Sequence, residues 1–347
     1  MTRLLADSTV HTLNPWVVRF TDEFGIRWYG LAYLTGFVVA WLLLTWMART
    51  RRCLLTPIQV TDFLTWGIAG VVIGGRLGHA IFYDQSLLWT VSSSPPFWAL
   101  LAIHKGGMSS HGGIIGVVIA SILFGRRIQV PFLHLTDLSA LVAAPGLGLG
   151  RIANWVNGEL WGRPLPSSWW GSPPWWSVKF PEEALTFPPG SQAAAAVDAA
   201  ARQLGMQPLP GHSLARQMVA ACYAGQQDAI QLLSPILAPR WPSQLMQAAT
   251  DGVILLAALL GVWWKPRRPG VVTGCFFAFY GALRLMTEQI RMPDPDPTTI
   301  AGFTLPMQLS ALMIVGGAAV ATWAARRPAP RIGGIGAPQR PAGGVAS

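Results

Sequence analysis

Long apolar runs occupy most of this chain and constrain its fold more than any other feature. A helix needs about 20 mostly apolar residues to cross a membrane, and 52% of the 347 residues are hydrophobic while only 12% are charged. A soluble domain usually carries about a quarter charged residues, so a soluble protein with a large core is disfavoured. The sequence predicts an all-α integral membrane protein with seven transmembrane helices. The seven runs are Trp28–Met47, Phe63–Phe82, Gly113–Phe124, Leu135–Val156, Gln244–Trp264, Val271–Ile290 and Leu305–Trp323.

Basic residues cluster after every second run and so predict the orientation of the chain. Loops rich in lysine and arginine stay in the cytoplasm, which places the C-terminus there and the N-terminus outside it. The chain has a net charge of +10, but its basic clusters lie between apolar runs, where they indicate topology, whereas nucleic-acid binding would require a solvated basic face. The clusters are Arg49, Arg51 and Arg52, then Arg126 and Arg127, then Lys265, Arg267 and Arg268, and finally Arg326 and Arg327.

The runs divide the chain into five regions. We expect an extracytoplasmic segment over 1–27 without a cleaved signal peptide, helices 1–4 over 28–162, an extracytoplasmic head over 163–241, helices 5–7 over 242–327, and a disordered cytoplasmic tail over 328–347. Serine starts and glycine ends predict two helices in the head, Ser191–Gly205 and Ser213–Gly225. The third run is short, so it either crosses at a tilt or follows a re-entrant piece around Phe97–Ile103.

Polar side chains gather near one end of four runs. With the orientation above, all of them lie in one extracytoplasmic layer, and polar groups inside membrane spans are functional candidates. Structural polarity scattered through the bundle would not sort in this way. The residues are Arg76 and His79 of the second run, His111 of the third, Arg151, Asn154, Asn157 and Glu159 of the fourth, and Tyr280, Arg284, Glu288 and Arg291 of the sixth.

The spacing in the sixth run predicts one polar helix face, because its four residues recur every three or four positions. Glu288 can pair with Arg284 or with Arg291, which leaves the other partly uncompensated. Together with Arg151, this predicts spare positive charge suited to an anion, and the planar guanidinium fork fits phosphate oxygens. The alternative, which applies most to Arg76 and Arg291, is a set of ion pairs that hold the bundle together.

His111 lies between glycines, in "GGMSSHGGIIG". Glycines permit close backbone approach by a neighbouring helix or a ligand. The imidazole is either a general base or a satisfied structural group, and the residue type alone leaves both open.

Taken together, these segments resemble the prolipoprotein diacylglyceryl transferase family. The resemblance covers almost the whole chain except the head and the tail, and its six blocks occur in the family order. It implies a seven-helix bundle in the bacterial inner membrane, with an extracytoplasmic head between the fourth and fifth helices. The blocks are "WYG" (28–30), "GGRLGHAIFYD" (74–84), "GGMSSHGGIIG" (106–116), "GRIANWVNGELWGRP" (150–164), "PSQL" (242–245) and "YGALRLMTEQIRMPD" (280–294).

The resemblance also implies an activity, which is transfer of the diacylglyceryl group of phosphatidylglycerol to the lipobox cysteine of a prolipoprotein. It implies no metal or organic cofactor. Because the substrate supplies the thiol, Cys53, Cys222 and Cys275 are not required. The implied roles are headgroup binding by Arg151 and Arg284, catalysis by His111 as base with help from Tyr280, and a supporting pocket that includes Tyr29, Asn154, Glu159, Gly162 and Glu288. We add Asn157, Arg291 and Arg76 to that pocket because they lie in the same predicted layer.

The chain departs from the family pattern at four positions. In "RWPSQLMQ", Trp241, Met246 and Gln247 replace an expected histidine, tyrosine and glutamate, and Lys105 stands where aspartate is common. These changes leave a non-catalytic or altered-substrate relative open as an alternative. A transporter of anionic amphiphiles would show interrupted helices in both halves of a repeat, and no such repeat is evident.

Overall fold

The computed structural model describes residues 8–20, 25–91, 93, 95–103, 106–210, 212–293, 299–300 and 302–336. The chain forms two compact units, and each is described by itself. The first contains residues 1–36, 145–254 and 280–312, and the second contains residues 37–144, 255–279 and 313–347.

The described chain is mostly helical, with short paired strands. Six helices have the length and hydropathy of membrane spans, and α10 is a shorter apolar helix, so the protein has the predicted all-α multipass membrane fold. The helices are α1 (Trp28–Arg49), α2 (Pro57–Phe82), α3 (Ser110–Ile128), α4 (Phe132–Val156), α5 (Gln192–Gln203), α6 (Leu214–Tyr223), α7 (Gln227–Leu233), α8 (Ser243–Gln247), a π-helical segment (Ala248–Ile254), α9 (Leu255–Val262), α10 (Val271–Thr287) and α11 (Leu305–Arg326). The strands are β1 (Thr9–Val10), β2 (Trp16–Arg19), β3 (Gly25–Arg27), β4 (Val178–Lys179), β5 (Thr299–Ile300) and β6 (Phe303–Thr304).

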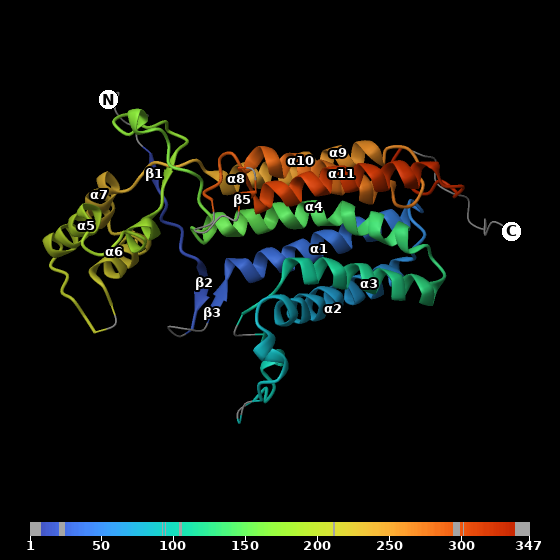
Figure 1. Cartoon of the computed structure of the whole chain (residues 1–347), viewed down its shortest axis with the longest axis horizontal. Helices are drawn as coiled ribbons and strands as arrows, with labels where there is room; N and C mark the ends of the chain where they lie inside the picture. Colours follow the sequence, from blue (N-terminus) through green and yellow to red (C-terminus); the bar gives the residue numbers. More distant parts are fainter. Residues whose placement is uncertain are drawn as a thin grey trace. The chain divides into compact units, whose positions relative to one another are not determined.

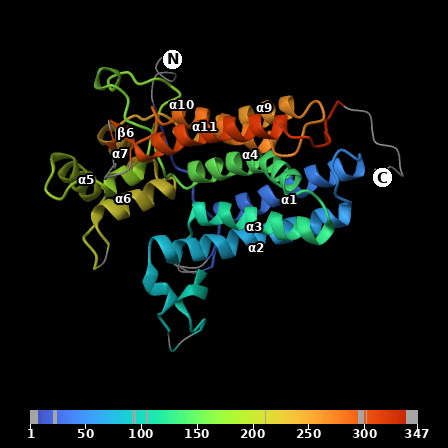
Figure 2. The ribbon, with the colours of Figure 1, turned by 45° about the vertical axis from the view of Figure 1, so that its right-hand side comes forward.

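Glycines bring α2 and α3 together in the second unit, where the two helices lie side by side (Figures 1 and 2). A side chain at Gly78 would come within 2.7 Å of the Gly112 Cα atom, and one at Gly74 would come within 2.8 Å of Gly116 Cα. Small residues allow helix backbones in a membrane to approach closely. The glycines therefore allow this close packing, and the short third run lies within a helix of 19 residues.

Residues 327–336 follow α11 and belong to the second unit. Ile332 exchanges two backbone hydrogen bonds with Arg267, and Arg52 donates to the Gly334 carbonyl at 2.9 Å. The prediction of a disordered tail from residue 328 is therefore wrong for 328–336, and the rest of that tail lies outside the described residues.

The first unit contains the head, whose helices α5, α6 and α7 lie together (Figure 1). Ser191 and Ser213 cap α5 and α6 with their side chains, and Gly205 and Gly225 follow with positive φ angles, as their sequence signals predicted. The third helix, α7, was not predicted. Strand β1 pairs in parallel with β4, which joins the N-terminal segment to the head.

Candidate functional site

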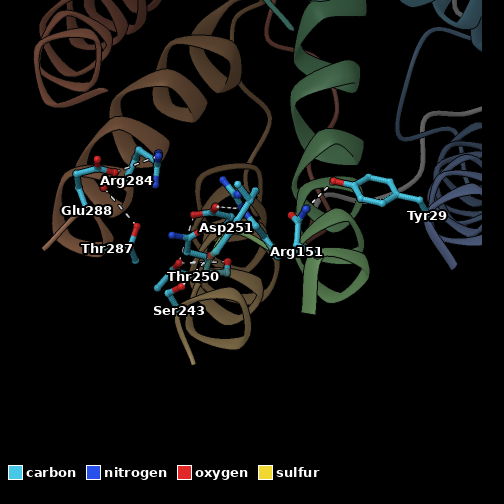
Figure 3. Close-up of polar contacts among 11 residues, drawn as sticks. Tyr29, Arg151, Ser243, Thr250, Asp251, Arg284, Thr287 and Glu288 are labelled. Carbon is cyan, nitrogen blue, oxygen red and sulfur yellow. Dashed lines mark hydrogen bonds and ion pairs between the residues drawn. The ribbon is translucent and has the colours of Figure 1, made fainter. Parts of the chain in front are cut away.

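A hydrogen-bonded network joins the start of α1 to the end of α4. The Asn154 amide donates to the Tyr29 hydroxyl at 2.6 Å and to Glu159 Oε1 at 3.0 Å, and Asn157 Nδ2 lies 3.5 Å from the same oxygen. Figure 3 shows the Tyr29 hydroxyl directed toward α4. Four predicted pocket residues therefore meet in the first unit, with Asn154 as their buried centre.

The turn after α4 requires glycine at position 158. Gly158 has a φ of +65°, and a side chain there would lie 2.8 Å from a Glu182 oxygen and 2.9 Å from the Tyr223 hydroxyl. Both groups belong to the head. Burial raises the pKa of Glu182, and burial followed by the nearby Glu182 charge raises the pKa of Tyr223. The head thus closes directly over the turn that carries Asn157 and Glu159.

Arg151 is paired with an acid that the sequence analysis missed. Its Nε atom lies 3.4 Å from Asp251 Oδ2, and the Asp251 side chain is fully buried in the π-helical segment (Figure 3). Within the part of the chain that the structure describes, Arg151 makes its hydrogen bond through Nε and none through its terminal nitrogens. Asp251 is the single acidic residue in the run Gln244–Trp264, and a lone acid in an apolar span was the signal that could have revealed it.

Arg284, Glu288 and Arg291 form a second charged group at the end of α10. Glu288 contacts both arginines, with Arg284 Nη2 at 3.0 Å and Arg291 Nη1 at 3.7 Å. Glu288 therefore contacts both arginines rather than one, and its single negative charge offsets only part of their two positive charges. However, Arg284 Nη1 is buried without a hydrogen-bond partner among the described residues. Tyr280 lies one turn earlier on α10 and is half-buried.

The segment that departs from the family pattern supports the end of α4. Gln244 donates to the Glu159 carbonyl at 2.8 Å, and Ser243 donates to the Leu160 carbonyl at 3.2 Å. A side chain at Gly162 would lie 2.8 Å from Trp241 Cβ, so this pocket position needs glycine for close packing. These contacts fix the backbone that follows Glu159.

The three substituted side chains of this segment have different environments. Trp241 stacks on Trp176 with ring centroids 4.7 Å apart, Met246 is exposed, and Gln247 is buried. Gln247 Nε2 has no hydrogen-bond partner within the described part of the chain. Lys105 lies outside the described residues.

Arg76 belongs to the second unit, where backbone carbonyls surround its guanidinium. It donates to Leu100 and Ala99 at 2.7 Å each and to Gly106 at 2.6 Å. These bonds hold the segment that precedes α3. Arg76 therefore holds this segment through backbone carbonyls, and not through the ion pairs that the alternative in the sequence analysis expected.

His111 also belongs to the second unit. It lies in the first turn of α3, after the Ser109 cap, and its side chain is exposed. Its role as a general base therefore stays a prediction from the sequence.

Comparison with known proteins places this arrangement in a family. The model of the prolipoprotein diacylglyceryl transferase family matches residues 15–323. The chain belongs to this family. The match includes all the residues of the candidate site, from Tyr29 to Arg291.

Individual relatives are similar over most of their length. The phosphatidylglycerol–prolipoprotein diacylglyceryl transferase of Bdellovibrio bacteriovorus is 37% identical over 335 residues, which cover 89% of this chain and 92% of the relative. Proteins of the same name from Ruegeria pomeroyi and Cereibacter sphaeroides are each 36% identical and cover 81% of this chain, with 79% and 80% of the relative matched. The similarity therefore extends through the head as well as the membrane helices.

Proposed function

We propose that this protein is a phosphatidylglycerol–prolipoprotein diacylglyceryl transferase. It moves the diacylglyceryl group of phosphatidylglycerol onto the thiol of a lipobox cysteine, which forms a thioether and releases glycerol phosphate. The observation that carries the proposal is the incomplete pairing of Arg151 and Arg284 in a member of this family. Arg151 contacts Asp251 through Nε, and Arg284 keeps a buried nitrogen without a hydrogen-bond partner among the residues that the structure describes.

These two arginines bind the phosphate of the lipid headgroup. The glyceryl carbon–oxygen bond breaks during transfer, so negative charge grows on the departing phosphate. Guanidinium groups that are already in place stabilise that charge where it develops, and their planar forks match phosphate oxygens. Tyr29, Asn154, Asn157 and Glu159 shape the neighbouring surface, and Glu288 and Arg291 support Arg284.

The substrate thiol supplies the nucleophile. Its sulfur forms a bond to the glyceryl carbon while the carbon–oxygen electron pair leaves with glycerol phosphate. A thiol with a pKa near 8.5 needs a base to become thiolate. His111 takes that proton, and Tyr280, one turn from Arg284, assists at the headgroup.

The chain works in the bacterial inner membrane, with its N-terminus outside the cytoplasm and its C-terminus in the cytoplasm. Alternating basic loops support that orientation. Its substrates are then a membrane lipid and the lipobox of an exported protein, both of which reach the extracytoplasmic face. The reaction as written needs neither a metal nor an organic cofactor.

The test is direct transfer by the purified protein. Phosphatidylglycerol with a labelled acyl chain is incubated with a lipobox peptide, and mass spectrometry follows the peptide. We expect a thioether-linked diacylglyceryl peptide and free glycerol phosphate, and no product from a peptide whose cysteine is replaced by serine. Absence of product, while a standard family enzyme gives product alongside, would contradict the proposal and favour the non-catalytic alternative.

A further inference from the structure

Asp251 is a fully buried carboxylate in an apolar helix. It lies in the π-helical segment Ala248–Ile254, between α8 and α9, and its side chain has 0% exposure. A carboxylate in such a span is costly and is kept where it pairs with another group. Its two oxygens have different partners, because Oδ2 faces Arg151 Nε at 3.4 Å and Oδ1 accepts from the Thr250 hydroxyl at 3.2 Å.

The contact engages one side of the Arg151 guanidinium. Guanidinium carries five donors in a planar fork, and Asp251 meets the fork at Nε. A carboxylate at Nε restricts rotation of the guanidinium plane and leaves the terminal nitrogens available. The Asp251 contact therefore sets both the plane of the fork and the edge that an incoming anion meets.

The backbones of α4 and the π-helical segment approach each other closely beside this pair. A side chain at Gly148, three residues before Arg151, would lie 2.8 Å from Gly252 Cα, next to Asp251. The glycines allow α4 and the π-helical segment to approach until the two charged groups meet. Single-turn π segments within α-helices are frequent at functional sites, and here the segment carries the carboxylate.

We propose that Asp251 is a positioning residue for diacylglyceryl transfer. Its carboxylate holds Arg151 so that the terminal nitrogens face the departing phosphate. The inference rests on the proposed function, because it assigns to Asp251 the orientation of a phosphate ligand.

This role predicts opposite effects on binding and on turnover. Asp251 is an anion near the phosphate, so removing its charge does not weaken, and can strengthen, binding of phosphatidylglycerol in the ground state. Loss of orientation instead weakens stabilisation of the transition state. Displacements of about 1 Å in such groups cost about 10²-fold in rate.

The experiment measures kcat and KM for phosphatidylglycerol in purified Asp251→Asn, Asp251→Glu and Thr250→Val, normalised to the folded, monodisperse fraction. We expect Asp251→Asn to lower kcat about 10- to 100-fold without raising KM. Asp251→Glu should recover part of the lost kcat because it restores a carboxylate. Thr250→Val, which keeps the carboxylate and removes one donor to it, should cause a smaller fall in kcat.

Asp137→Asn is the matched control. Asp137 is a second buried carboxylate, but it accepts from the backbone N–H groups of Gly270 at 2.8 Å and Thr273 at 2.7 Å. Its loss should lower the thermal stability while kcat per folded molecule stays unchanged. A merely structural role for Asp251 would reproduce that pattern.

The proposal is overturned if Asp251→Asn keeps a wild-type kcat, if it raises KM at constant kcat, or if Asp251→Glu recovers nothing. If Asp251→Asn does not fold, the kcat values of Asp251→Glu and Thr250→Val test the proposal instead. A wild-type kcat in both of these variants overturns it. If the wild-type protein gives no product, the proposed transferase function is contradicted, and the proposed role of Asp251 in that reaction is contradicted as well. Product from wild type together with unchanged variants overturns only the role of Asp251.

Discussion

Two arginine–carboxylate pairs of the first unit differ in how many of the guanidinium donors contact protein groups. Arg240 contacts both Glu183 oxygens, at 2.6 and 3.4 Å, donates to the Gly162 carbonyl at 3.1 Å, and lies 5.2 Å from the Trp161 ring centre. Arg151 has one 3.4 Å contact with Asp251 and a side chain that is 17% exposed. The first arginine has little capacity for a ligand, whereas the second keeps most of its donors available.

The same contrast separates two arginines of the membrane helices, each within its own unit. Arg76 donates to several backbone carbonyls, while Arg284 keeps one buried nitrogen without a partner in the described structure. An arginine in an apolar helix therefore does not mark a ligand site by itself. The partners of its donors decide whether it holds structure or binds an anion.

The largest expected effect is on turnover when an incompletely paired arginine is removed. We expect Arg151→Ala and Arg284→Ala each to lower the transfer rate at least about 10²- to 10³-fold, as loss of one charge-stabilising donor does in other enzymes. Initial rates with labelled lipid test this, together with size-exclusion profiles that report folding. Near-normal turnover in either variant would show that its guanidinium does not meet the phosphate.

Removing the fully paired Arg240 should affect stability instead. Arg240→Met leaves Glu183 buried without its cation, which costs about 3–5 kcal/mol. Thermal unfolding in detergent should show a clear fall in Tm. The double variant Arg240→Met/Glu183→Leu removes both charges and should regain much of the loss, so a double variant no more stable than the single one would contradict this account.

A smaller effect is expected at the Tyr29 hydroxyl. Tyr29→Phe loses the bond from Asn154, which is worth about 1 kcal/mol and corresponds to a fall in kcat/KM of about fivefold. Tyr33→Phe is the control, because Tyr33 lies one turn later on α1 and is 61% exposed. Equal kcat/KM values for the two variants would remove Tyr29 from the site.

The smallest effect concerns His11, which packs among the rings of Trp155, Phe180 and Tyr223. Burial lowers the pKa of His11 from its ordinary value of 6.5. Below pH 6.5, His11 therefore binds a proton more readily in the unfolded chain than in the folded protein. The free energy of unfolding falls as the pH is lowered through this range.

Tm measured between about pH 7.5 and about pH 5.5 tests this linkage. His11→Phe should show a weaker decrease in Tm than wild type, and the exposed His212→Gln should match wild type. An unchanged pH profile in His11→Phe would assign the decrease to other groups.

Local signals were enough to predict the head helices, because serine caps and terminal glycines act within one turn. The spans and the network around Asn154 also follow from apolar length and from a recognisable motif. Spacing also predicted Glu288 as the partner of Arg284 and Arg291, but the partners of Arg151 and Arg76 did not follow from the sequence. Asp251 is 100 residues from Arg151, and Arg76 pairs with backbone carbonyls, which every residue possesses and which leave no mark in the sequence.

The order of residues 328–336 was hidden for the same reason. Its composition is typical of disorder, but its backbone hydrogen bonds go to Arg267 and Trp263. Such partners depend on tertiary structure rather than on side-chain type. Sequence patterns therefore predicted which polar residues are candidates, and the structure was needed to separate the arginines by the partners of their donors.

The central claim is that incompletely paired arginines bind the phospholipid headgroup, and its most direct test is the affinity for phosphatidylglycerol. The double variant Arg151→Gln/Arg284→Gln is compared with wild type and with Arg202→Gln/Arg216→Gln, which removes two exposed charges from head helices α5 and α6. Native mass spectrometry of lipid titrations reports each Kd. We expect the first variant to bind at least about tenfold more weakly, equivalent to about 1.4 kcal/mol, while the second matches wild type. Equal affinity in all three proteins would contradict the claim.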